Sequence, residues 1–280
     1  MRLLVTGAAG MLGQRVVRDA RALGHAVTGL CRPDLDLTDE DATARRVAEL
    51  APDTVINCAA YTDVDGAEDH EQLALAVNAD AVGNLARAAA QIAARVVHVS
   101  TDYIFGGPRS TPWLESDTPA PQGAYGRTKL AGELQLAHAT AEHAIVRTAW
   151  LFGSGGDNFC DTMLRLAGER DEVSVVTDQV GSPTWSGHLS PALIELADRR
   201  GDVGVFHGAG AGQCSWNELT LELFQRAGVS CRVLPTTSDQ FRRRAPRPAW
   251  SVLGTEREPG VRLAPWQDGV QGHLDERRTA

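Results

Sequence analysis

The chain of 280 residues has a single lysine, Lys129, against 26 arginines. An ammonium group is a compact donor that the planar guanidinium of arginine does not replace. Any role that requires a lysine side chain therefore falls on this position. Tyrosine is also scarce, because Tyr61, Tyr103 and Tyr125 are the only three. Few residues can thus supply a phenolic hydroxyl.

Cysteines, basic runs and long apolar runs are sparse as well. The five cysteines are odd in number and lack zinc-site spacing, which predicts reduced, buried thiols in a cytoplasmic protein and no metal centre. A net charge of −9 argues against a nucleic-acid partner. The short basic cluster of residues 242–244 and Arg247 is instead a candidate contact for a diphosphate. No signal peptide or transmembrane run is evident, so we expect no membrane partner.

The segment Tyr125-Gly-Arg-Thr-Lys129 places a phenol and the single ammonium four residues apart. On a helix these positions share one face, so both groups can contact the same bound molecule. A neighbouring cation stabilises phenolate and lowers the pKa of a tyrosine, which predicts that Tyr125 is a proton donor. An exposed tyrosine and a solvated lysine on an amphipathic helix would give the same spacing.

A glycine-rich turn follows the first apolar run, residues 2–6. Small residues at such a turn allow backbone N–H groups to approach a pyrophosphate and let the helix pack closely on the strand. The spacing is not the common G-x-G-x-x-G, and a purely structural turn is the alternative. Its place at the start of a strand and helix pattern favours dinucleotide binding by Gly7, Gly10, Met11, Leu12 and Gly13.

The residues after the second apolar run, 26–30, bear on the choice of cofactor. Arg32 suits the 2′-phosphate of NADPH, whereas Asp34 or Asp36 suits the ribose hydroxyls of NADH. We expect NADPH, with Asp36 and Leu37 near the adenine. A solvated Arg32 would leave NADH possible.

Apolar runs recur at 2–6, 26–30, 54–57, 96–100 and 144–149, with helical patterns between them. This alternation predicts an α/β fold with a doubly wound parallel sheet of the Rossmann type. Beyond residue 148 the chain becomes rich in glycine and tryptophan. We therefore predict a dinucleotide-binding domain over 1–148, to which later segments can return, and a smaller, mainly substrate-binding C-terminal lobe over 149–280.

Two polar segments, 57–62 and 100–103, follow the third and fourth apolar runs. Ligands of doubly wound proteins bind beyond the carboxyl ends of the strands, so these segments belong at the site. Short motifs across nearly the whole chain then resemble the extended short-chain dehydrogenase/reductases, and most closely the dTDP-4-dehydrorhamnose reductases. They are Gly7 to Gly13, Asn57 to Asp65 with Glu68, Asn78, Ser100 to Phe105, Tyr125 to Lys129 with Gly132 and Glu133, Arg147 to Gly153, Asn158 and Phe159, Asp178 to Thr184, and Arg247 with Pro248.

The resemblance implies a catalytic triad of Thr101, Tyr125 and Lys129. Tyr125 would protonate the carbonyl oxygen as a hydride arrives from the nicotinamide, Thr101 would hydrogen-bond that oxygen, and Lys129 would bind the nicotinamide ribose and lower the tyrosine pKa. The remaining positions implied by the family lie nearby in the sequence. Ala59, Ala60 and Tyr61 would face the cofactor, and Val64, Asp102, Tyr103 and Trp150 would contact the sugar.

The implied activity is NADPH-dependent reduction of the C4 ketone of a dTDP-4-keto-6-deoxy sugar, in a monomer or homodimer. The related 4,6-dehydratases carry a glutamate where this chain has Tyr103, which argues against elimination of water. A regulatory subunit that binds NADP without turnover and a nucleotide-sugar epimerase are the alternatives. Gly106 and Gly107 replace an expected acidic residue, and the match after Arg247 is loose, so the identity of the sugar stays open.

Other polar and aromatic residues have less specific interpretations. Arg147 and Arg247 are candidate phosphate contacts, with structural ion pairs as the alternative. Arg247 is also a predicted substrate contact. The histidines at 98, 188 and 207 lack metal-like spacing, and we expect them to be structural. The tryptophans at 185, 216 and 266 are expected to pack in the core or in the smaller lobe.

Overall fold

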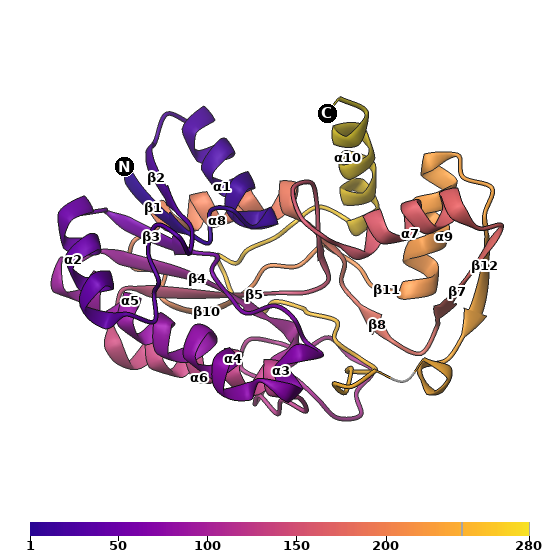
Figure 1. Ribbon diagram of the computed structural model, residues 1–280, viewed down its shortest axis with the longest axis horizontal. Coiled ribbons are helices and arrows are strands. Elements are labelled where there is room, and N and C mark those ends of the chain that lie inside the picture. Colours follow the sequence, from indigo (N-terminus) through magenta and orange to yellow (C-terminus); the bar gives the residue numbers. More distant parts are fainter. Residues whose placement is uncertain (242, 280) are drawn as a thin grey trace.

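Six parallel strands form the main sheet, in the order β10-β5-β4-β3-β1-β2 (Figure 1). The computed structural model describes residues 1–241 and 243–279, so Arg242 of the basic cluster lies outside the described residues. The predicted doubly wound α/β fold is confirmed. The strands are β1 (Arg2–Thr6), β2 (Ala26–Leu30), β3 (Thr54–Asn57), β4 (Arg95–Thr101), β5 (His143–Thr148) and β10 (Gly204–His207).

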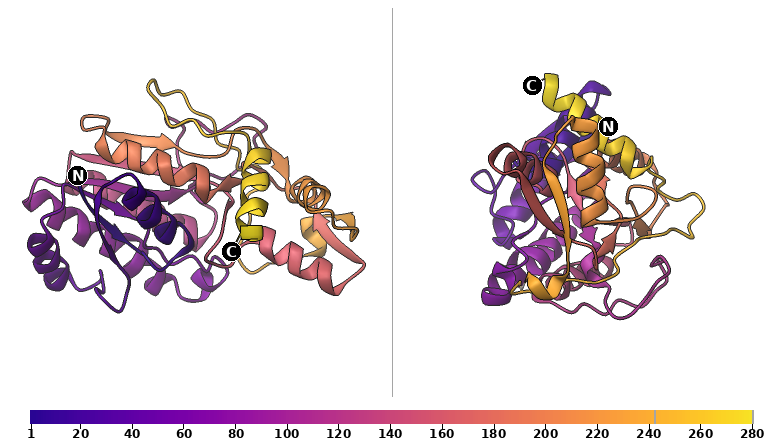
Figure 2. Two further views of the ribbon diagram at one scale, coloured as in Figure 1. Left: turned by 90° about the horizontal axis from the view of Figure 1, so that it is seen from above. Right: turned by 90° about the vertical axis from the view of Figure 1, so that its right-hand side faces the viewer.

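Alternate residues of the strands pack into two separate cores, because successive side chains of a strand point to opposite faces. Leu3 and Val5 of β1 join one core with helices α1 (Met11–Ala22) and α8 (Ser186–Asp198). Leu4 joins the other core, and three helices cover that face (Figure 2). They are α2 (Glu40–Leu50), α5 (Ala81–Gln91) and α6 (Ala124–Ala139).

A second group of elements stands beside the main sheet and packs around its own apolar core (Figure 1). Three two-stranded pairs and three helices build it. The pairs are β6 (Leu151–Phe152) with β9 (Thr184–Trp185), β7 (Glu172–Val176) with β12 (Arg232–Thr236), and β8 (Val180–Gly181) with β11 (Cys214–Ser215). The helices are α7 (Phe159–Glu169), α9 (Trp216–Ala227) and α10 (Trp266–Thr279). Strand β10 and helix α8, which follow β6 and β7 in the chain, return to the main sheet.

Short helical segments complete the chain, and several lie near the carboxyl edge of the sheet. A short π-helix, η1, connects α4 to α5. The segments are α3 (Gly66–Asp69), α4 (Glu71–Leu75), η1 (Ala76–Asp80), η2 (Asp102–Ile104) and η3 (Ser238–Gln240).

The cysteines only partly match the expectation of buried thiols. All five are free, and Cys160 and Cys214 are buried in the smaller core, whereas Cys31, Cys58 and Cys231 are partly exposed. The latter three lie at strand ends or in loops, where packing is incomplete. Among residues 1–241 and 243–279, no group of three side chains is placed to hold a metal ion, and no helix is long and apolar enough to cross a membrane.

The strand order changes direction at β1. Strand β2 lies on one side of β1 and β3 on the other, so the connections that leave β1 and β3 diverge. Such a switch point leaves a crevice at the carboxyl ends of the strands. The turn after β1 and the turn after β3 meet there, because a Cβ atom on Gly7 would lie 2.6 Å from the backbone nitrogen of Ala59.

Candidate active site

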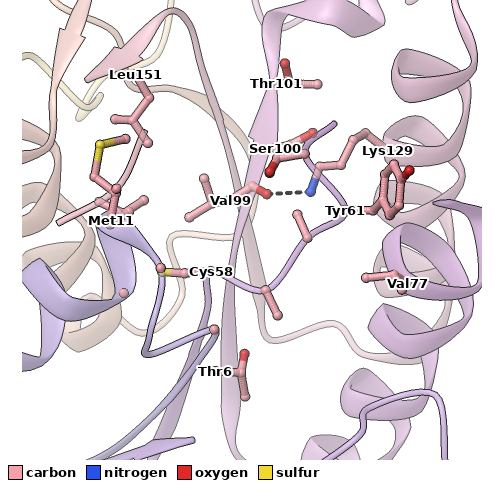
Figure 3. Close-up of a pocket in the computed structure, with 18 of the residues that line it drawn as sticks. Thr6, Met11, Cys58, Tyr61, Val77, Val99, Ser100, Thr101, Lys129 and Leu151 are labelled. Atoms are coloured by element: carbon pink, nitrogen blue, oxygen red, sulfur yellow. Dashed lines mark hydrogen bonds between the residues drawn. The ribbon is translucent and has the colours of Figure 1, made fainter. Parts of the chain in front are cut away.

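A cavity of about 820 Å³ opens at this switch point. It is lined by the glycine-rich turn, the carboxyl ends of β2, β3 and β4, the start of α6 and the segment after β5 (Figure 3). The predicted catalytic, cofactor-binding and sugar-binding residues line it, whereas the candidate phosphate contacts Arg147 and Arg247 do not. The lining residues include Gly7, Gly10, Met11, Leu12, Gly13, Arg32, Asp36, Leu37, Ala59, Ala60, Tyr61, Val64, Thr101, Asp102, Tyr103, Tyr125, Lys129 and Trp150.

The glycine-rich turn is shaped for a close approach by its backbone. Gly7 has a φ of +68°, and a Cβ atom on Gly13 would lie 2.1 Å from the Gly7 carbonyl oxygen. Helix α1 begins directly after Gly10, and no side chain caps it. Its first N–H groups therefore remain available to an anion, which the positive end of the helix dipole favours.

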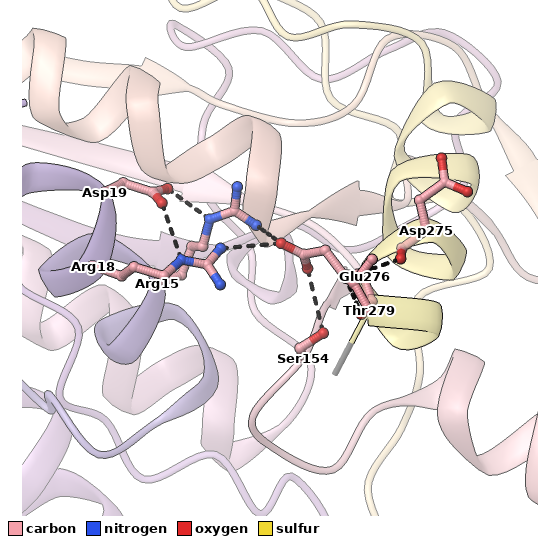
Figure 4. Close-up of polar contacts among 7 residues, drawn as sticks. All are labelled: Arg15, Arg18, Asp19, Ser154, Asp275, Glu276 and Thr279. Carbon is pink, nitrogen blue, oxygen red and sulfur yellow. Dashed lines mark hydrogen bonds and ion pairs between the residues drawn. The ribbon is translucent and has the colours of Figure 1, made fainter. Parts of the chain in front are cut away.

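A glycine-rich loop after β6, which carries Ser154 (Figure 4), lies against this turn, because a Cβ atom on Gly156 would lie 3.0 Å from the Cβ atom of Met11. Gln14 joins the two, because its Nε2 donates to the carbonyls of Ala9 (2.6 Å) and Gly155 (3.2 Å). Glu276 of α10 contacts both the same loop and α1 (Figure 4). Its carboxylate accepts a hydrogen bond from Ser154 Oγ of the loop at 3.3 Å and one from Arg15 of α1 at 2.5 Å. Helix α10 thus links α1 to the loop after β6, which lines the cavity through Gly156 and Asp157.

Arg32 and Asp36 lie at the rim where β2 ends. The Arg32 side chain is exposed, and its Nε is 3.8 Å from Asp36 Oδ2. Thr38 donates two hydrogen bonds to Asp36 Oδ1, from its backbone N–H at 3.0 Å and its hydroxyl at 2.7 Å. These bonds lower the pKa of Asp36. The carboxylate is therefore engaged within the protein, whereas the guanidinium is only weakly held.

The side-chain amides of two buried asparagines, Asn57 and Asn78, hydrogen-bond the backbone of the turn after β3. Ala59 N–H donates to Asn57 Oδ1 at 3.0 Å. Asn78 of η1 accepts from Tyr61 N–H at 2.8 Å and donates to the Tyr61 carbonyl at 3.2 Å. The backbone of 59–61 is thus fixed toward the cavity, which explains the asparagines of the sequence motifs.

Lys129 is almost fully buried, with 1% of its surface exposed. From α6 it reaches β4, where its Nζ donates to the Val99 carbonyl at 2.8 Å (Figure 3). It also contacts Nε2 of His98 at 3.2 Å. Burial lowers the pKa of Lys129 to about 8, against the smaller opposing effects of Glu133 and Cys58.

Tyr125 lies one helical turn before Lys129, and it lines the cavity together with Thr101. Loss of solvent raises the pKa of the Tyr125 phenol well above its usual range, and the Thr101 hydrogen bond opposes this only in part. The expectation that Lys129 brings this pKa toward neutrality is therefore wrong for this geometry. The Nζ of Lys129 is instead directed to the Val99 carbonyl and the His98 ring.

Asp102 is a buried carboxyl group beside the same tyrosine. Burial raises its pKa to about 6, although Ser251 and Thr101 hydroxyls act to lower it. Thr101 donates to Oδ1 at 3.1 Å, while Oδ2 has no geometrically satisfactory hydrogen-bond partner in the part of the chain that the structure describes. A buried carboxyl oxygen without a partner is costly, so a bound polar group would satisfy it.

Trp216 packs against the apolar core of the smaller unit, which agrees with the prediction, and it also faces the cavity. Its ring lies against Trp150 with 3.5 Å between centroids and 2° between planes, and both residues line the cavity. Trp150 has a φ of +46°, which is unusual for a residue with a side chain. No local sequence signal links the two tryptophans, because Trp216 belongs to α9 of the smaller unit.

The two arginines that were candidate phosphate contacts form ion pairs instead. Arg147 pairs with Glu133 at 2.7 Å in the interior. Arg247 does not line the cavity: it pairs with Asp65 at 3.0 Å and lies over the Tyr103 ring. Arg147 and Glu133 lie on the consecutive elements β5 and α6, whereas Arg247 and Asp65 are 182 residues apart. In neither case does the sequence spacing distinguish the ion pair from a ligand contact.

The chain matches the family model for the RmlD substrate binding domain over residues 1–279. It is 44% identical over 276 residues to a dTDP-4-dehydrorhamnose reductase of Mycolicibacterium smegmatis, covering 96% of this chain and 84% of that protein. It is 43% identical over 270 residues to a Streptomyces antibioticus protein named as a probable dTDP-4,6-dihydroxy-2-methyloxan-3-one 4-ketoreductase, covering 96% and 92%.

A solved structure shares the complete fold. It is the dTDP-4-dehydrorhamnose reductase of Bacillus anthracis in complex with NADP, with a TM-score of 0.95, 36% identity, and coverage of 98% of this chain and 99% of that one. The sequence match, the shared fold and the cavity agree with one another. The chain therefore belongs to the RmlD substrate binding domain family, and it is an oxidoreductase of the dTDP-4-dehydrorhamnose reductase type.

Proposed function

We propose that this chain reduces the C4 ketone of a dTDP-4-keto-6-deoxy sugar to an alcohol with NADPH. The observation that carries the proposal is that one cavity holds both the glycine-rich turn and the set Thr101, Tyr125 and Lys129. The named activities of the relatives support the class of sugar. Because those names differ in the sugar itself, the proposal extends to the 4-keto group and not to one stereoisomer.

The residues of the turn fit a dinucleotide. The uncapped start of α1 would bind the diphosphate, and the fixed backbone of 59–61 would lie along the nicotinamide half. Lys129 would bind the ribose hydroxyls from below. The bound cofactor supplies a hydride from C4 of the nicotinamide.

Tyr125 is the proton donor in this proposal. Its raised pKa keeps the phenol protonated near neutral pH, so the donor form is always present. The phenol is still a stronger acid than an alcohol, and proton transfer to the oxygen that gains charge is favourable. Thr101 would hold the phenol and the ketone oxygen in line through its hydroxyl.

The sugar would lie between Asp102 and the stacked tryptophans. Asp102 Oδ2 needs a partner, which a sugar hydroxyl would provide. Tyr103 packs edge-on against Tyr125, with 5.6 Å between ring centroids. A tyrosine at this position offers no carboxylate to remove a proton from the sugar, so reduction is favoured over elimination.

The preference for NADPH rests on Arg32. Its exposed guanidinium is free to reach a 2′-phosphate, whereas Asp36 is occupied by Thr38. A guanidinium binds phosphate well. The relative from Bacillus anthracis was solved with NADP.

The deciding experiment follows the absorbance of reduced nicotinamide when the protein is mixed with NADPH or NADH and a dTDP-4-keto-6-deoxyhexose. We expect oxidation that depends on the sugar and is faster with NADPH. Controls omit the sugar or use Tyr125→Phe. Binding of NADPH without its oxidation by any 4-keto sugar would overturn the proposal and favour a regulatory subunit.

A further inference from the structure

A buried chain of polar groups runs beneath the cavity from β1 to Lys129. Thr6 on β1 donates its hydroxyl to Asn57 Oδ1 at 2.7 Å, and Asn57 Nδ2 lies 3.0 Å from His98 Nδ1. The Nε2 of His98 lies 3.2 Å from Lys129 Nζ. His98 is fully buried, and burial holds its pKa well below the usual range, so its ring is neutral.

The direction of the hydrogen bonds in this chain is fixed from the Asn57 end. The backbone N–H of Ala59 can only donate, so the amide oxygen of Asn57 must face it, and Nδ2 must face His98. An amide nitrogen also only donates. Nδ1 of His98 is therefore the acceptor, and the single proton of the neutral ring sits on Nε2.

This tautomer points a donor at the lysine. An ammonium has no lone pair that could accept an N–H, whereas an uncharged amine has one. The amine can accept from His98 Nε2 and still donate to the Val99 carbonyl at 2.8 Å. If Lys129 is an ammonium, a proton on His98 Nε2 faces the N–H donors of Lys129, and a proton on His98 Nδ1 faces the N–H donor of Asn57. Two donors that face each other without an acceptor are unfavourable in the interior.

We propose that His98 is a positioning residue that stabilises the uncharged amine of Lys129 in the cofactor-free protein, so that cofactor binding is accompanied by uptake of a proton at Lys129. The proton comes from solvent and converts the amine to the ammonium. An anionic dinucleotide in the cavity favours this charged form. Reduction of a ketone consumes one proton besides the hydride, and the uptake brings a proton into the site beforehand.

The other titratable groups around Lys129 act in the opposite direction or remain neutral. Glu133 on α6 favours the ammonium, but it is paired with Arg147. Cys58 after β3 is partly exposed to the cavity, but loss of solvent raises the pKa of its thiol to about 12, so the thiol stays neutral. Tyr125 stays a neutral phenol. The depressed pKa of Lys129 therefore agrees with the hydrogen-bond argument but is not its basis.

The single lysine allows a direct test. Protein labelled with ¹³C at lysine Cε has one side-chain signal, which can be titrated in the cofactor-free protein and with saturating NADP⁺. We expect a pKa near 8 without cofactor and a higher value with NADP⁺. His98→Gln, which can present an oxygen to Nζ, should move the cofactor-free value toward the ordinary 10.5. His207→Gln changes a buried histidine elsewhere and should leave it unchanged.

Calorimetry gives a second readout. The measurement is made at about pH 9, above the cofactor-free pKa of Lys129 and below its expected pKa with NADP⁺ bound. There the enthalpy of NADP⁺ binding should depend on the ionisation enthalpy of the buffer, with the sign that corresponds to proton uptake. A wild-type lysine that titrates at its ordinary value would overturn the inference, even if His98→Gln does not fold. A buffer-independent enthalpy would refute the uptake. The uptake rests on the proposed function, so absence of NADP⁺ binding would refute both, while the cofactor-free titration still decides the role of His98.

Discussion

The Nζ of Lys129 donates to the carbonyl oxygen of Val99 at 2.8 Å, which anchors the single lysine of the chain to the fourth strand. The lysine is held before any ligand is bound, and little room surrounds it because 1% of its surface is exposed. The packed sheet and α6 therefore fix the position of the lysine side chain before a ligand binds.

Lys129→Arg should weaken NADPH binding and lower turnover, with a combined loss in kcat/KM of about 100-fold. The planar guanidinium cannot occupy the narrow space between α6 and β4 or keep the bond to the Val99 carbonyl. Titration calorimetry and steady-state kinetics measure the two effects. The matched control is Arg127→Lys on the exposed side of the same helix, which should change neither; unaltered kinetics in Lys129→Arg would remove the ammonium from the proposed role.

Tyr125→Phe should lower kcat by about 100-fold or more, since general acid catalysis typically contributes that much. Cofactor affinity should change little, because the substitution removes only the hydroxyl beside Thr101. Single-turnover kinetics and NADPH titration separate the two. A variant with nearly normal kcat would show that another group supplies the proton.

Gly13→Ala should destabilise the protein by about 1 to 3 kcal/mol and weaken dinucleotide binding, because the added methyl overlaps the Gly7 carbonyl. Gly168→Ala is the matched control: it is an exposed helical glycine on α7 with open space around it, and it should stabilise by about 0.5 to 1 kcal/mol. Denaturant unfolding measures both. Equal effects of the two changes would contradict the close approach in the turn.

Arg32→Ala should lower the ratio of kcat/KM for NADPH to that for NADH by about tenfold, as expected for loss of one exposed charge-assisted contact. Rates with NADH should hardly change. Arg46→Ala, an exposed arginine on α2 that does not line the cavity, serves as the comparison. A constant ratio in Arg32→Ala would place the choice of cofactor elsewhere.

Asp102→Asn should stabilise the protein above pH 6 while impairing catalysis. The folded pKa of about 6 lies above the ordinary 3.8, so the folded protein binds more protons between these values and loses stability as the pH rises through them. At pH 7.5 the penalty reaches about 3 kcal/mol, and it vanishes below the unfolded pKa. Unfolding free energies of both proteins should therefore converge as the pH falls toward 4. A difference independent of pH would contradict the raised pKa.

The main sheet could be predicted from local patterns of apolar and small residues. The five apolar runs became β1 to β5 because buried parallel strands need continuous apolar sequence and turns of small residues. The turn at Gly7 and the spacing of Tyr125 and Lys129 are likewise local, since a few bonds fix which groups share a turn or a helical face. These features could be predicted from the sequence alone.

Contacts between distant segments were decided only by the tertiary structure. Trp216 joins Trp150 in the cavity although 65 residues separate them in the chain, and Arg247 turns to Asp65 instead of the cavity. The charge state of Lys129 depends on His98 of β4 and Asn57 of β3, which a helical motif does not contain. The sequence by itself determined which chemical groups are present and which local elements carry them. Packing of those elements determined their partners, because hydrogen bonds and desolvation depend on distances that sequence spacing does not encode.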